Sequence, residues 1–84
     1  MQAIVDTNTL RLRYIAPDTT EIVVNDSGVV LPTFHINDMG KRNTAIIKFD
    51  GTIPPGMTAD EARGWNANNW LFNPFTKKFE MVGI

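Results

Sequence analysis

Residues 65–79 read WNANNWLFNPFTKKF and hold both tryptophans and three of the five phenylalanines of this 84-residue chain. Aromatic side chains each bury roughly 150–250 Å², so most of the large apolar area of the chain lies in this stretch. A domain of this size has a small core, and five aromatic rings exceed what such a core usually encloses. The stretch therefore predicts both the centre of the hydrophobic core and a surface on which aromatic groups face a partner.

The C-terminal half of this stretch predicts a β-hairpin. Residues 70–73 are expected to pair with residues 79–82 across a turn at 74–78. Alternation of side chains along the two strands then defines the inner face of the hairpin. That face is expected to comprise Trp70, Phe72, Phe79 and Met81.

A short helix is predicted just before the hairpin. Thr58 and Glu61 have the spacing of a capping box, in which each side chain bonds the backbone amide of the other residue. The helix begins at Ala59 and lasts at most about two turns, because Gly64 and the Asn-rich residues 66–69 form helices weakly. Residues 52–56 contain two prolines and predict an extended linker ahead of it.

Upstream, apolar residues recur with period two in short runs bounded by Gly, Pro, Asn and Asp, which is typical of half-buried antiparallel strands. The first hairpin is expected to join the second and third strands through the turn at 16–20. A second tight turn is expected at 25–28, where Asp and Gly tolerate a left-handed backbone. The predicted strands are Ala3–Thr7, Thr9–Ile15, Glu21–Asn25, Val29–Ile36 and Thr44–Asp50.

Two of these strands carry further expectations. In the second strand, Leu10, Leu12 and Tyr14 alternate with two arginines, which predicts one apolar face and one solvent-facing face. In the fourth strand, Pro32 has no N–H to donate, so this strand is expected to be an edge strand or to bulge at Pro32.

Together these elements predict a single β-rich domain over residues 1–84. The expected fold is mainly β: a small antiparallel β-barrel or sandwich of about six or seven strands, with one short helix before the C-terminal hairpin.

Composition argues against metal and cofactor chemistry. The chain has no cysteine and one histidine, so neither a thiolate site nor an imidazole cluster is available for zinc. The run that starts at Asp6 begins like a calcium loop, but Arg11 and Pro17 occupy the positions of its Gly and Glu. The other aspartates follow turn positions, where Asp bonds its own backbone. We expect no metal site and no cofactor.

No catalytic residue is expected either. His35 would need a nucleophile, and the only serine, Ser27, lies in a predicted turn without the residues that surround a hydrolase nucleophile. The sequence favours a partly exposed strand histidine for His35, and it predicts that the protein is not an enzyme.

The formal net charge of −1 provides no general attraction to nucleic acid or to anionic lipid. Arg11 and Arg13 could contact phosphates, but they are more typical of a solvated strand face.

No run of apolar residues is long enough to span a membrane, and the N-terminus lacks the basic and apolar regions of a signal peptide. The sequence predicts a protein made in a cytoplasm, with no membrane partner.

Partner contact is the one role that the sequence favours for individual residues. Phe75 lies in a turn, where a large apolar group has no core to enter, and hairpin-tip aromatics commonly anchor interfaces. Trp65 and Leu71 are not placed on the inner face, and the strand of Pro32 offers an edge for added pairing. The candidate partner-binding residues are therefore Trp65, Leu71, Phe75 and Pro32.

A compact, cysteine-free, turn-dense β domain with aromatics left for a partner resembles the small accessory proteins of phage particles, such as capsid decoration or cement proteins. The resemblance covers the whole chain in style, and no motif carries it. It implies a structural protein that binds a larger assembly or itself, located in a virion or a host cytoplasm. The alternatives are a phage-encoded inhibitor of a host enzyme or complex, and a small nucleic-acid-binding barrel.

Overall fold

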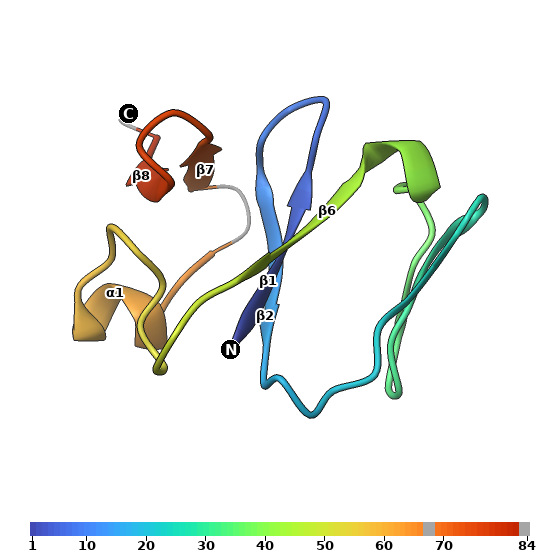
Figure 1. The fold of residues 1–84 in the computed structure, drawn as a ribbon, viewed down its shortest axis with the longest axis horizontal. Helices are drawn as coiled ribbons and strands as arrows, with labels where there is room; N and C mark the ends of the chain where they lie inside the picture. The colour runs from blue at the N-terminus through green and yellow to red at the C-terminus, as the bar shows by residue number, and fades with distance from the viewer. Residues whose placement is uncertain (67–68, 83–84) are drawn as a thin grey trace.

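The computed structural model describes residues 1–66 and 69–82, and in these residues the protein is mainly β, as predicted. The strands form three small antiparallel sheets, which do not close into a barrel within the described ranges (Figure 1). The elements are β1 (Gln2–Asp6), β2 (Leu12–Ala16), β3 (Val23–Asn25), β4 (Gly28–Val30), β5 (His35–Ile36), the 3₁₀ helix η1 (Lys41–Asn43), β6 (Thr44–Lys48), α1 (Ala59–Arg63), β7 (Trp70–Asn73) and β8 (Lys78–Met81).

β1 is the middle strand of the central sheet, whose order is β2-β1-β6. Successive side chains of a strand point to opposite faces. Ala3 and Val5 therefore join one buried cluster and Ile4 joins another. The central sheet lies between two outer layers, with α1 and the β7–β8 hairpin on one side and the β3–β4–β5 sheet on the other (Figure 1).

The prediction that Leu12 and Tyr14 share a face is wrong. The register of β1 and β2 shifts at a β-bulge, so that Ile4 pairs with Tyr14 and Val5 pairs with Leu12. Arg13 is the extra residue, and it moves Tyr14 to the opposite face from Leu12. Leu12 accordingly packs in the cluster toward the C-terminal layer, whereas Tyr14 packs toward the β3–β4–β5 sheet.

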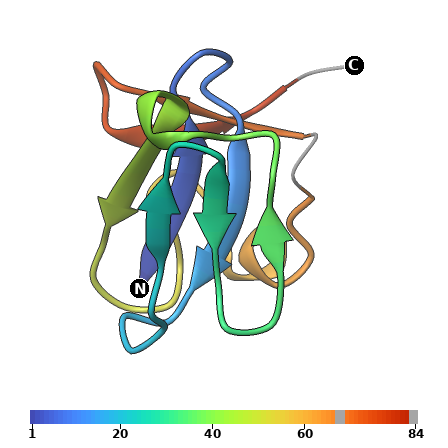
Figure 2. The ribbon, with the colours of Figure 1, turned by 90° about the vertical axis from the view of Figure 1, so that its right-hand side faces the viewer.

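The expected hairpin between the second and third strands is also wrong. β2 pairs with β1, while β3 belongs to the separate sheet β3-β4-β5, which lies in front of the central sheet in Figure 2. Apolar period two marks strands but does not identify their partners. The tight turn before Gly28 is confirmed, because Asn25 pairs with Gly28, whose φ is 154°.

The predicted strand Val29–Ile36 is two strands. Its middle residues, Pro32 and Thr33, lie in the connection between β4 and β5, where the Leu31 amide donates to the Phe34 carbonyl at 2.9 Å. Pro32 has no N–H for a ladder, so it occupies the connection rather than a bulge in a continuous edge strand.

The C-terminal layer follows the prediction closely. Thr58 and Glu61 make both bonds of the capping box at the start of α1. β7 and β8 form the predicted hairpin, but β8 begins at Lys78, one residue earlier than predicted, so the turn is one residue shorter. Phe72 pairs with Phe79, and these two rings are buried together with Trp70. Met81 pairs with Trp70 and so lies on the expected inner face, but it is 56% exposed because it lies at the open end of the hairpin.

Two buried clusters hold the three layers together. The first lies between the central sheet and the C-terminal layer and consists of Ala3, Val5, Leu12, Met57, Trp70, Phe72 and Phe79. The second lies between the central sheet and the β3–β4–β5 sheet and consists of Ile4, Val29, Leu31, Ile36 and Met39. In the described residues, no helix has the length and apolar character needed to cross a bilayer.

Candidate interaction surface

The tip of the β7–β8 hairpin presents Phe75 to solvent, with 93% of the side chain exposed. The Asn73 side-chain oxygen accepts hydrogen bonds from the amides of Phe75 at 2.9 Å and Thr76 at 3.3 Å. The Lys77 amide donates to the Asn73 carbonyl at 2.8 Å, and Lys77 adopts a φ of 61°. These contacts fix the backbone under Phe75, so the ring is held away from the core by the local turn.

An apolar depression of about 280 Å³ adjoins the Phe75 ring. Leu71 lies in it half-buried, on the outer face of β7 opposite Glu80. The depression therefore combines the outer face of the hairpin with the β1–β2 connection. It is lined by Leu10, Leu71, Phe72, Asn73, Pro74, Phe75 and Glu80.

Charged groups surround the hairpin tip. Lys77 and Lys78 are exposed, and neither makes an ion pair with another described residue. The Glu80 carboxylate accepts a hydrogen bond from the Asn73 side-chain amide at 3.3 Å. An exposed aromatic ring inside a polar rim is the arrangement that protein interfaces commonly use for an anchor.

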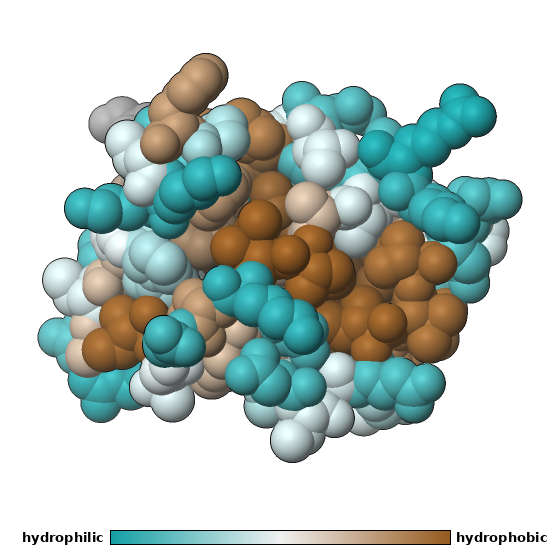
Figure 3. Space-filling model, viewed as in Figure 1, coloured by the Kyte–Doolittle hydropathy of each residue, from teal (hydrophilic) through white to brown (hydrophobic). Residues whose placement is uncertain are grey.

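A second apolar surface lies on the outer face of the β3–β4–β5 sheet. Val23 and Val30 pair directly across the two strands and are 45% and 38% exposed. Together with Glu21, Leu31 and Pro32 they line a depression of about 230 Å³. Hydrophobic surface also continues from β6 across to the β3–β4–β5 sheet on the face shown in Figure 3.

The four candidate residues do not gather at one site. Phe75 and Leu71 lie together on the C-terminal layer, whereas Pro32 lies with the second apolar surface beyond the central sheet. Trp65 is half-buried and packs against the first cluster. The sequence thus identified residues of two separate surfaces and one residue that contributes to the core.

Trp65 also belongs to a row of three aromatic rings that no pattern in the sequence predicts. The Tyr14 ring makes T-shaped contacts with Phe34, at a centroid distance of 4.8 Å, and with Trp65, at 6.2 Å. These three rings come from the β4–β5 connection, from β2 and from the segment after α1, so the row links all three layers. Only the bulge at Arg13 places Tyr14 on the side where this row forms, and no sequence pattern marks that bulge.

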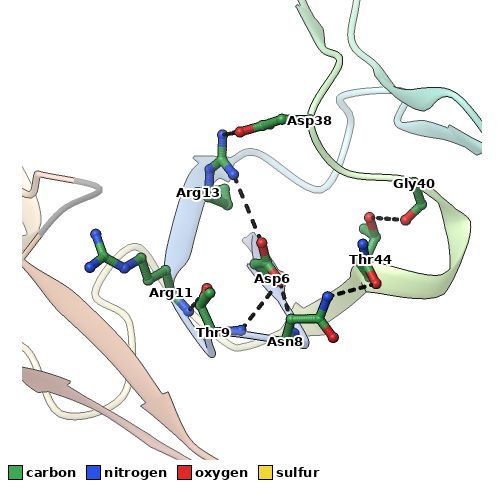
Figure 4. A network of polar contacts seen from close by, with 9 residues as sticks. Asp6, Asn8, Thr9, Arg11, Arg13, Asp38, Gly40 and Thr44 are labelled. Atoms are coloured by element: carbon green, nitrogen blue, oxygen red, sulfur yellow. Dashed lines mark hydrogen bonds and ion pairs between the residues drawn. The ribbon is translucent and has the colours of Figure 1, made fainter.

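A polar network surrounds Arg13 near the start of β2 (Figure 4). Its guanidinium donates to both oxygens of Asp38, at 2.9 and 3.1 Å, and lies 4.0 Å from an oxygen of Asp6. The hydrogen bond from Arg13 lowers the pKa of Asp38 below its ordinary value of 3.8, and the positive charge acts in the same direction. Arg13, a candidate for phosphate contact, is therefore already bound to carboxylates.

The described residues do not bring together three or more His, Asp or Glu side chains in a metal-binding group. His35 is exposed on β5. The Ser27 hydroxyl donates to the Asn25 side-chain oxygen at 3.0 Å, within the β3–β4 turn. Ser27 therefore stabilises the turn between β3 and β4.

Comparisons with protein-family models, with curated proteins and with solved structures find no match to this chain.

Proposed function

We propose that the chain is a non-enzymatic interaction protein that binds and stabilises a larger protein assembly, as a capsid decoration or cement protein of a phage particle does. One observation carries the proposal: exposed apolar side chains gather on both outer layers of the domain. Phe75 and its depression lie on one side of the central sheet, and Val23 and Val30 lie on the other.

This placement suits a small protein that bridges larger bodies. Interface anchors are apolar or aromatic groups surrounded by polar residues, and each outer layer presents such a group. An 84-residue domain has a small core. Binding that involves only the folded state stabilises it by mass action, and it stabilises the assembly in return.

The second apolar surface is the proposed site for the larger assembly. β3 and β6 are outer strands of their sheets and lie on the same side of the molecule (Figure 2). Outer strands offer backbone groups to an added strand, and the valine side chains beside β3 offer apolar contacts. Pro32 borders this surface without contributing an N–H.

The test is co-sedimentation of the purified chain with phage particles from its native source in a density gradient. The wild-type chain is expected to sediment with the particles, and the variant Val23→Asp/Val30→Asp is expected to remain unbound. The control is Thr52→Asp/Ala59→Asp, which introduces the same two negative charges at exposed positions of the C-terminal layer. The proposal fails if the wild-type chain stays at the top of the gradient, or if the Val23→Asp/Val30→Asp variant sediments like the control.

The two alternative functions predict different experimental results. Recovery of one host enzyme in a one-to-one complex, by mass spectrometry of the native material, would replace the particle component with an inhibitor. Binding to single-stranded nucleic acid that weakens steeply with salt would favour a nucleic-acid-binding domain.

A further inference from the structure

We propose that a second copy of this chain binds the outer face of the β7–β8 hairpin, with Phe75 of each copy seated in the depression beside Leu71 of the other. The inference rests on the proposed role of Phe75 as a contact residue and names its partner. Leu71 and Glu80 pair on this outer face, and so do Asn73 and Lys78.

The edges of the hairpin are already occupied. The Phe72 amide of β7 donates to the Leu10 carbonyl, and the Phe79 amide of β8 donates to the Pro55 carbonyl, each at 2.8 Å. Strand addition at these positions would have to displace existing hydrogen bonds. A partner of this hairpin therefore packs on its face and uses side chains.

The hairpin carries an exposed ring and an apolar depression side by side. Phe75 is 93% exposed, and its backbone is fixed by the Asn73 side chain. A rigid anchor loses little conformational freedom on binding, which favours affinity. Because the ring and the depression belong to the same surface, two copies related by a two-fold axis make both contacts at once.

The charges on this face complement each other under the same symmetry. Lys78 and Glu80 are two residues apart on β8 and point to the same side. When two such strands face each other in antiparallel directions about an axis level with Phe79, Lys78 of one copy lies opposite Glu80 of the other. Each copy then contributes one lysine and one carboxylate to two equivalent ion pairs.

This arrangement also gives the Lys78 side chain an ion-pair partner. Within its own chain, Lys78 makes no ion pair with another described residue. The formal net charge of −1 adds little repulsion between copies. Opposite charges across an interface set its register and orientation, so this pattern selects the antiparallel two-fold packing. The contact is small, and its dissociation constant is expected in the weak range of transient interfaces.

Sedimentation equilibrium of the isolated chain, up to about 1 mM, tests the proposal. The wild-type chain is expected to be in monomer–dimer equilibrium, and Phe75→Ala to raise the dissociation constant about thirtyfold or more, as for an interface hot spot. Val23→Ala, on the opposite outer layer, is the matched control and should leave the constant unchanged. A wild-type chain that stays monomeric, or a Phe75→Ala dimer as tight as wild type, overturns the proposal.

Charge exchange tests the symmetry. Lys78→Glu and Glu80→Lys are each expected to weaken the dimer, because each places like charges opposite one another. The double variant Lys78→Glu/Glu80→Lys restores opposite pairs and should recover most of the affinity. If the double variant is as weak as the single variants, the proposed packing is wrong.

Thermal melting of every variant monitors folding, and Phe75→Ala should melt within a few degrees of wild type because its ring lies outside the core. A large fall in melting temperature would place Phe75 in the core and overturn the proposal. Failure of the proposed dimer is distinguishable from failure of the proposed function. A monomeric chain that still sediments with phage particles would refute only the self-association.

Discussion

Gly56 lies against the C-terminal hairpin with a φ of +90°. A Cβ atom built on Gly56 would overlap the carbonyl oxygen of Phe79, and the Phe79 amide donates to Pro55 next to it. Gly51 has a similar φ of +73°, but its Cβ would meet no atom within 4 Å. The two glycines therefore separate the effect of backbone conformation from the effect of crowding.

We predict that Gly56→Ala lowers the free energy of unfolding by about 2–4 kcal/mol, because both backbone strain and displacement of the hairpin act against it. Gly51→Ala should lower it by only about 1 kcal/mol, from strain alone. Urea denaturation of the two variants measures the difference. Equal losses would show that the segment before α1 moves freely away from β8.

At the scale of the element, α1 has only five residues and depends on its N-terminal cap. A helix this short has little intrinsic stability, so capping and packing must hold it. The Thr58 hydroxyl accepts from the Glu61 amide at 3.2 Å, and the Glu61 carboxylate accepts from the Thr58 amide at 2.8 Å. None of the five helical residues is fully buried, and Ala62 is the helical residue that packs against the first cluster, so the capping box is an important local support.

We predict that Thr58→Ala destabilises the domain by about 1 kcal/mol, the usual effect of removing such a cap. Thr58→Ser keeps the hydroxyl and should retain most of that stability. Chemical denaturation gives the loss, and hydrogen exchange of the Glu61 amide shows whether it is local. An alanine variant as stable as the serine variant would mean that the linker, and not the cap, fixes the start of α1.

At the scale of the whole molecule, the link between Arg13 and Asp38 joins the central sheet to the segment that follows β5. Asp38 is 63% exposed, so its ion pair is worth less than about 1 kcal/mol. The bond from Arg13 lowers the pKa of Asp38 in the folded protein. The stabilisation is therefore complete above the ordinary pKa of an aspartate and is lost as the pH falls through the lower value of the folded state.

We predict that Asp38→Asn lowers the free energy of unfolding at about pH 6 by less than about 1 kcal/mol, and that this difference shrinks as the pH is lowered from there through and below the ordinary pKa of an aspartate. Asp50→Asn, an exposed change without an ion pair in the described residues, is the matched control for the loss of one carboxylate. Urea denaturation across this pH range measures both. A constant difference between Asp38→Asn and wild type would mean that the carboxylate charge contributes nothing.

Local patterns in the sequence predicted local structure well. The capping box at Thr58 and Glu61, the tight turn at Gly28 and the C-terminal hairpin are all confirmed. Each depends on residues close together in the chain, whose hydrogen bonds and backbone preferences act regardless of the rest of the fold. The exposure of Phe75 follows from the same local cause, because the turn holds the ring away from both strands.

Contacts between residues far apart in the sequence could not be predicted from local patterns. The partner of β2, the bulge at Arg13 and the aromatic row through Tyr14 each depend on which strand lies beside which. The half-buried position of Trp65 depends on the same arrangement.

The sequence by itself determined the mainly β character, the hairpin ends and the short capped helix, because these follow from the spacing of apolar, turn-forming and capping residues. The tertiary structure alone decided that β1 serves two cores, that Pro32 and Phe75 lie on separate outer layers, and that Trp65 helps to join those layers. The physical reason is that strand pairing and the packing of layers arise from contacts between residues far apart in the chain, and the period of a single strand carries no information about its neighbour.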